Sequence, residues 1–211
     1  MRLAAALVVL LAGAASASLP TGGDGGSAGF AAAYGGAAYA IVTDPGASAG
    51  RVIVRRLGFD GGVLWEDRWG EARGESPVDA AVTAWGGLSV VGNDSQGCFA
   101  VRWSSRGARL WSQDLRGGAA CQARSVLVDG SGNVYVLATA TTAGISQPDV
   151  WKIDRRGQVL WSYRPSRPTT RYAYALALDA AGDGVTVTTA QSGPEGWTYA
   201  SFDLDAAGNP R

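Results

Sequence analysis

Short apolar or alternating stretches recur along most of the chain, and each ends in glycine, aspartate or asparagine. In residues 126–139 (VLVDGSGNVYVLAT), for example, two apolar stretches flank the polar turn DGSGN. Alternation with a period of two is typical of β-strands, and a short turn rich in these residues joins two antiparallel strands. The 3.6-residue periodicity of an amphipathic helix is not found. The pattern therefore predicts an all-β chain built of hairpins.

This hairpin is repeated along the chain. Four segments can be aligned in one frame, the second of them with one residue deleted: 30–43, 81–92, 126–139 and 176–189. Tyr39 then falls under Tyr135, and Gly182 falls under Gly132 at a separation of 50. Self-similarity at a fixed period of this length indicates a repeat architecture.

A second hairpin follows each first one, and its turn carries a glycine. A tryptophan stands four residues after the first three of these glycines. The repeat positions are Gly61 with Trp65, Gly107 with Trp111, Gly157 with Trp161, and Gly208. Units of four short strands at this spacing are typical of propeller blades, which bury their faces by stacking on their neighbours. We therefore expect a β-propeller of about four repeat units, with four-stranded antiparallel blades and the tryptophans packed between adjacent blades.

The predicted blades are about 30–70, 78–116, 123–164 and 173–211. The last is expected to be incomplete, with three strands, because the sequence stops three residues after Gly208. Its final strand, 197–204, would then be a sheet edge with unpaired backbone groups. Self-association through this incomplete blade is therefore expected, unless a partner chain or a longer propeller supplies the missing strand.

The segment DGSGNVYVLA, followed by DVWKIDRRGQVLW, resembles the bacterial secreted β-propeller repeat family (SBBP-type repeats). Those repeats read roughly as a DxxGNVYV hairpin, a variable loop and a K-x-D-x-x-G-x-x-x-W hairpin. The resemblance covers about residues 30–211 and is sharpest in 123–163. It implies a propeller and no particular function, because the matched positions are turn and packing positions.

A more distant resemblance is to the quinoprotein-like (PQQ-like) propeller repeats, whose blades also end in Gly-x-x-x-Trp. Here Lys152 stands where that motif has alanine, and Asp154 precedes Gly157 by three residues rather than four. No quinone or other cofactor is therefore expected.

The first 17 residues are predicted to be a signal peptide. Met1-Arg2 is followed by the apolar run 3–15, and Ala15-Ser16-Ala17 supplies the small residues that precede cleavage before Ser18. The alternative is an uncleaved anchor, but 13 apolar residues fall short of the roughly 20 that a membrane-spanning helix needs. Residues 18–29 are expected to be a flexible Gly-rich linker. The protein is thus expected to be secreted or periplasmic, without a stable membrane anchor.

The amino-acid composition argues against several classes of function. The 211 residues include no histidine, which excludes histidine-based triads and histidine metal ligands. Lys+Arg and Asp+Glu both total 18, so charge provides no reason to expect nucleic acid as a partner. In an oxidising compartment Cys98 and Cys121 are expected to form a disulfide, the alternative being two buried free thiols.

No catalytic, cofactor-binding or metal-binding residue is predicted. Residues 129–133 place oxygen ligands at alternate positions, as a calcium loop does, but the aligned turns lack those oxygens and favour a hairpin turn. Lys152 is expected to lie between blades rather than to act as a reactive amine. Asp154 and Asp205 occupy matching turn positions, where capping explains them.

One loop is a candidate for ligand binding. It carries Tyr163, Arg164, Arg167, Arg171 and Tyr172. Such residues could bind an anionic or carbohydrate ligand, or they could belong to a solvated connector stiffened by proline.

The sequence thus favours a secreted or periplasmic, non-catalytic propeller that serves as a binding or scaffolding module for an unidentified protein or carbohydrate ligand. The alternatives are an extracytoplasmic propeller enzyme, quinoprotein-like or carbohydrate-active, with its site at the central channel, and a degenerate copy without a function of its own.

Overall fold

The structure, a computed structural model, describes residues 15–18, 29–34, 36–44, 51–71, 73–115, 120–166, 171–178, 182 and 184–211. These residues form sixteen strands in four antiparallel sheets and contain no α-helix. The all-β prediction is confirmed. No helix in these ranges is long and apolar enough to cross a membrane.

Each sheet is a simple meander, in which strands adjacent in the sequence are hydrogen-bonded neighbours. The first sheet contains β1 (Ala15–Ser18), β2 (Gly29–Tyr34), β3 (Ala37–Thr43), β4 (Val52–Leu57) and β5 (Val63–Trp69). The second contains β6 (Ser76–Val82), β7 (Leu88–Asp94), β8 (Gly97–Trp103) and β9 (Arg109–Leu115). The third contains β10 (Ala120–Val128), β11 (Val134–Thr142), β12 (Ile145–Ile153) and β13 (Val159–Tyr163). The fourth contains β14 (Tyr172–Leu178), β15 (Val185–Gly193) and β16 (Gly196–Leu204).

The first sheet differs from the expectation of four strands. Its additional strand, β1, pairs antiparallel with β2, with Ala15 opposite Ala33 and Ser18 opposite Phe30. Three residues of β1 belong to the predicted signal peptide, whose remaining residues, 1–14, lie outside the described residues, as do 19–28 of the predicted linker. The fourth sheet has the three strands expected of it.

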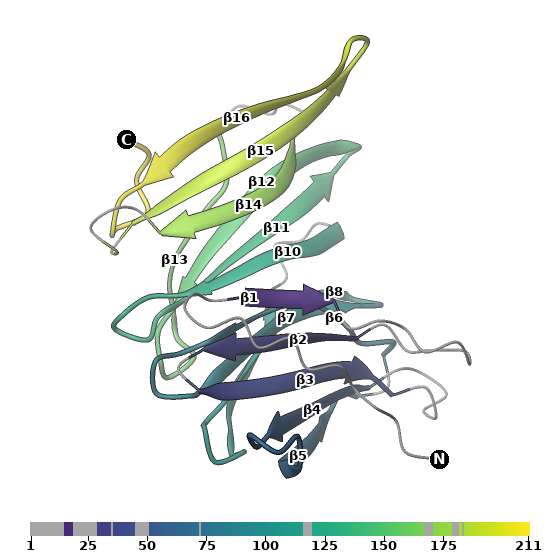
Figure 1. Cartoon of the computed structure of the whole chain (residues 1–211). Helices are drawn as coiled ribbons and strands as arrows, with labels where there is room; N and C mark the ends of the chain where they lie inside the picture. The colour runs from purple at the N-terminus through teal and green to yellow at the C-terminus, as the bar shows by residue number, and fades with distance from the viewer. Residues whose placement is uncertain are drawn as a thin grey trace.

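Consecutive sheets pack against one another, and in Figure 1 the fourth sheet lies at the top, above the third, with the first and second sheets overlapping below. Three clusters of buried apolar side chains lie between them. The first cluster joins sheets one and two around Tyr39 and Trp103, and the second joins sheets two and three around Val91 and Val136. The third joins sheets three and four around Leu137. Each core is therefore shared by two consecutive sheets.

The repeat tryptophans lie at equivalent positions on the boundaries between sheets, as predicted. Each indole lies against the turn glycine of the next sheet: Trp65 against Gly107, Trp111 against Gly157, and Trp161 against Gly208. Each indole Nε1 also donates a hydrogen bond to a carbonyl two residues before that glycine: to Ser105 at 3.1 Å, Arg155 at 3.3 Å and Ala206 at 3.0 Å. We refer to this contact as the tryptophan–glycine clasp. It explains the Gly-x-x-x-Trp spacing as a packing feature.

The predicted disulfide is confirmed. Cys98 on β8 and Cys121 on β10 are bonded, with their Cα atoms 5.4 Å apart. Both side chains belong to the core between the second and third sheets. Beside the bond, Asn93 Oδ1 accepts a hydrogen bond of 2.7 Å from the Ala123 backbone N–H. The second and third sheets are thus joined covalently as well as by packing.

Candidate functional site

The candidate site lies next to a set of positions that are equivalent in the repeats but carry different residues. A cation stands on β4 of the first sheet, on β8 of the second and on β12 of the third, and each pairs in register with a residue of the strand before. The pairs are Arg56 with Tyr39, Arg102 with Ser89, and Lys152 with Tyr135. All three cations donate to a backbone carbonyl of the next sheet, Arg56 to Ser105, Arg102 to Gly132 and Lys152 to Ala206. Lys152 thus lies between sheets, as expected.

The residue paired with each cation differs in size between the sheets. Tyr39 and Tyr135 are fully buried, and the Lys152 Nζ lies 5.0 Å from the centroid of the Tyr135 ring. The second sheet has Ser89 instead, whose buried Oγ has no hydrogen-bond partner among the described residues. A hydroxymethyl group thus stands opposite Arg102, where the equivalent cations of the first and third sheets face a hydroxybenzyl group.

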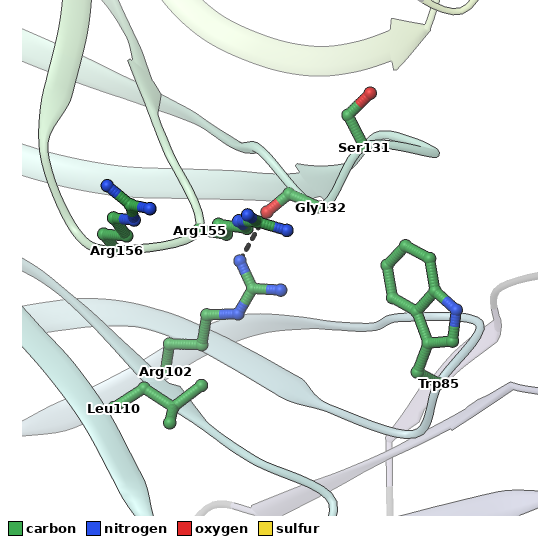
Figure 2. Close-up of a pocket in the computed structure, with 7 residues that line it drawn as sticks. All are labelled: Trp85, Arg102, Leu110, Ser131, Gly132, Arg155 and Arg156. Carbon is green, nitrogen blue, oxygen red and sulfur yellow. Dashed lines mark hydrogen bonds between the residues drawn. The ribbon is translucent and has the colours of Figure 1, made fainter.

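A recess of about 410 Å³ lies between the turns of the second and third sheets, and Arg102 is one of its walls. We refer to it as the arginine recess. Its walls are Trp85, Arg102, Leu110, Ser131, Gly132, Arg155 and Arg156. Figure 2 shows Trp85 on one side of the opening and the three arginines reaching in from the other. Residues of both sheets therefore build it, Trp85, Arg102 and Leu110 from the second and the rest from the third.

Gly132 is where the walls meet. Its φ of +83° is the left-handed conformation that a tight turn needs. A Cβ atom built there would lie 3.3 Å from Arg102 Nη2, 3.6 Å from Trp85 Cζ3 and 3.9 Å from Arg155 Cβ. A guanidinium, an indole and the β12–β13 turn thus approach one backbone position closely.

The electrostatics of the recess are dominated by unpaired positive charge. Arg102 is only 6% exposed, and its Nε has no hydrogen-bond partner among the described residues. Burial lowers the pKa of the Arg102 guanidinium, and the charges of Asp129 and Asp154 oppose that shift. An arginine nevertheless stays protonated in a protein. Within the described part of the chain, no carboxylate lies within ion-pair distance of Arg102, Arg155 or Arg156.

The neighbouring carboxylates are occupied in their own turns. Asp129 Oδ1 accepts the backbone N–H groups of Ser131 (2.9 Å) and Asn133 (2.8 Å), and its Oδ2 accepts Asn133 Nδ2 (2.7 Å) and the Tyr135 hydroxyl (3.3 Å). The hairpin-turn interpretation of residues 129–133 is therefore confirmed. No group of three or more His, Cys, Asp or Glu side chains that could hold a metal ion occurs among the described residues.

The other two turn aspartates behave in the same way. Asp154 Oδ1 accepts the backbone N–H groups of Arg156 and Gln158, both at 2.8 Å. Asp205 Oδ1 accepts those of Ala207 at 2.9 Å and Asn209 at 2.8 Å. The predicted capping role is confirmed for both.

The described residues of the loop that was expected to bind a ligand make contacts within the fold. Arg164 forms a bidentate ion pair with buried Asp149. The hydrogen bonds to the Asp149 carboxylate raise the pKa of the Arg164 guanidinium. The aromatic residues contact rings of the fourth sheet: Tyr163 is tilted against Phe202, and Tyr172 and Trp197 meet edge to face. The Arg171 backbone N–H donates to Ser146 O at 2.8 Å, and Arg167 lies outside the described residues. None of the described loop residues lines the arginine recess.

The residues of the recess were missed by sequence reasoning, although one signal was present. Aligning the repeats at their turn glycines puts Ser89 in a column with Tyr39 and Tyr135. The small residue shows that the second repeat differs beside Arg102, although Ser89 itself does not line the recess. The identity of the residues around the recess depends on contacts between two sheets and could not be read from the alignment.

Comparison with known proteins gives no family. No family model matches the chain, and no curated protein matches it. A solved structure titled "Crystal structure of the eukaryotic initiation factor" aligns with 83% of this chain and 51% of its own, at 10% identity and a TM-score of 0.46. The chain thus spans about half the length of that structure, and a likeness this weak assigns neither fold family nor function.

Proposed function

We propose that this chain is an extracytoplasmic, non-catalytic binding module built of β-propeller repeats, with a signal peptide removed before Ser18. The propeller assignment is supported by the tryptophan–glycine clasp, because propeller-type repeats bury their faces through one contact that recurs at each boundary. Removal of residues 1–17 would also reduce the first sheet to the four strands of a blade.

The observation that carries the binding role is the arginine recess. Its seven lining residues present three cations, an indole and one hydroxyl, and they include no carboxylate, thiol or imidazole that could act as acid, base or nucleophile beside a ligand. A concave site with charges lacking partners is suited to holding a ligand. The proposal therefore places a binding function at this recess.

The test compares binding with turnover. Thermal unfolding of the mature protein is measured with a panel of neutral sugars, acidic sugars, small carboxylates and phosphates, and each mixture is analysed by mass spectrometry after incubation. A ligand that binds only the folded state raises the unfolding temperature. We expect a stabilising ligand that is recovered unchanged. Consumption of that ligand would establish the enzyme alternative, and a panel without any stabilising member would refute the binding role.

Export has a separate test. The full-length sequence is expressed in a bacterial host, and the protein is recovered from the periplasm or medium for intact-mass measurement. We expect a chain that begins at Ser18. A cytoplasmic protein that retains Met1–Ala17 would contradict this part of the proposal.

A further inference from the structure

We infer that the arginine recess binds a small molecule that carries an oxyanion, phosphate or carboxylate, on a flat ring. This inference rests on the proposed binding function and names the ligand class of its site. It follows from three properties of the recess: a buried cation that lacks a counter-ion, two further cations at the opening, and an exposed indole.

The buried guanidinium of Arg102 would be stabilised by an anion. Arg102 donates one N–H to the Gly132 carbonyl, which leaves other N–H groups of the guanidinium, including Nε, without partners among the described residues. A buried charge without a partner is unfavourable, and a carboxylate or phosphate satisfies a guanidinium through parallel charge-assisted hydrogen bonds. Arg155 and Arg156 are exposed on the same turn and add positive charge at the mouth.

The flat ring is inferred from the apolar walls. Trp85 is 65% exposed and Leu110 is 52% exposed, although both line a concave site. In Figure 2 the indole lies across the opening from Leu110 and the arginines. A planar ligand could therefore stack on the indole while its anionic group meets the guanidiniums. The volume of about 410 Å³ suits a small molecule rather than a polymer.

The experiment uses four simple probes on the mature protein at low ionic strength. Phenyl phosphate and benzoate carry both features, inorganic phosphate lacks the ring, and benzyl alcohol lacks the charge. Affinities are measured by calorimetry and by tryptophan fluorescence. We expect phenyl phosphate or benzoate, or both, to bind at least ten-fold more tightly than either incomplete probe, and the tighter of the two identifies the anion. Added salt should weaken that binding.

Variants locate the binding. The double substitution R155A/R156A should weaken the tighter ring-bearing probe at least ten-fold. Arg106, the residue equivalent to Arg156 one repeat earlier, is exposed and outside the recess, so R106A is the matched control and should change nothing. Thermal unfolding of each variant verifies that it folds.

The inference is overturned if benzyl alcohol binds as tightly as the anionic probes, or if R155A/R156A binds them as the unaltered protein does. Failure of all four probes, while another member of the panel stabilises the protein, would reject this ligand class and leave the binding function standing. Failure of probes and panel alike would reject both.

Discussion

Gly157 is constrained twice, by its backbone angle and by the indole of Trp111. Its φ is +91°, and a Cβ atom added there would lie 2.7 Å from Trp111 Cγ. Gly61 occupies the equivalent turn of the first repeat with a φ of +77°, but nothing lies within 4 Å of its added Cβ. Comparing substitutions at these two glycines therefore separates the cost of the backbone angle from the cost of displacing the indole.

We predict that both G61A and G157A lose about 1–2 kcal/mol through the left-handed backbone. Only G157A must also displace an indole, so it should lose about 1–3 kcal/mol more. Urea unfolding of the two variants measures the difference. Equal losses would show that the indole contact adds nothing at this glycine.

Asp205 provides a prediction for pH. The Asn209 backbone N–H lowers the pKa of this carboxyl most, and the Asn209 side chain, the Ala207 N–H and Arg211 contribute in the same direction. Because the folded state favours the ionised form, its stabilising effect is present above the pKa of the unfolded chain and is lost as the pH falls through the lowered folded pKa.

Carboxyl NMR should therefore find Asp205 titrating below about 3.9, the ordinary value for aspartate. N209A removes one side-chain donor but keeps the backbone N–H, so it should recover only part of the shift. Titration of Asp205 at the ordinary value would mean that the turn hydrogen bonds do not form in solution.

At the scale of strands, the disulfide should be one of the stronger ties. Cys98 and Cys121 close a loop with a sequence separation of 23 residues. The chain-entropy model gives about 3 kcal/mol for a loop of this size. We predict that C98A/C121A loses about this much in chemical unfolding. The unaltered protein should lose a similar amount in reductant, and alkylation with intact-mass measurement should find no free thiol before reduction.

The edge of the fourth sheet should make the protein associate. β16 pairs with β15, and near its end it also contacts the C-terminal residues through the Leu204–Pro210 bridge and the hydrogen bond from Arg211 N–H to Asp203 O (3.0 Å). Trp197 and Tyr199 on this strand are more than half exposed. An unprotected edge strand of this kind is a template for pairing with another chain.

We predict concentration-dependent association in sedimentation, and its suppression by T198K, since charge on an edge strand opposes pairing. T142K, a change at an exposed strand end in the third sheet, is the control and should leave association unchanged. A monomer at all concentrations would contradict this prediction.

The strands were largely predictable because turn residues bound each of them. The predicted hairpin segment 126–139 falls on β10 and β11, and the predicted strand 197–204 lies within β16. β1 was not expected, because its sequence ASAS follows an apolar run that indicates a signal peptide. The recess could not be predicted either, since it needs Arg102 of one sheet and Arg155 of the next to face a common space.

For the whole molecule, the packing is between nearest neighbours. The second and third sheets share cores on both faces, whereas the first and fourth share a core on one face only, and they lie at opposite ends of the stack (Figure 1). Local unfolding requires less free energy where fewer apolar contacts are lost. Hydrogen exchange should therefore be slowest in β7, β8 and β11 and faster in β16. Uniform protection across the sheets would contradict this order.

The second and third repeats each carry both halves of the tryptophan–glycine clasp. In one hairpin the glycine receives the indole from the preceding repeat, and the tryptophan four residues later enters the following one. A duplicated repeat of this kind would carry both the glycine and the tryptophan of the clasp. An array of such units can therefore lengthen by duplication without a new interface. The same arrangement lets a single unit diverge. The second repeat has a serine at position 89 where its neighbours have tyrosine, and its Trp111 still makes the clasp with Gly157.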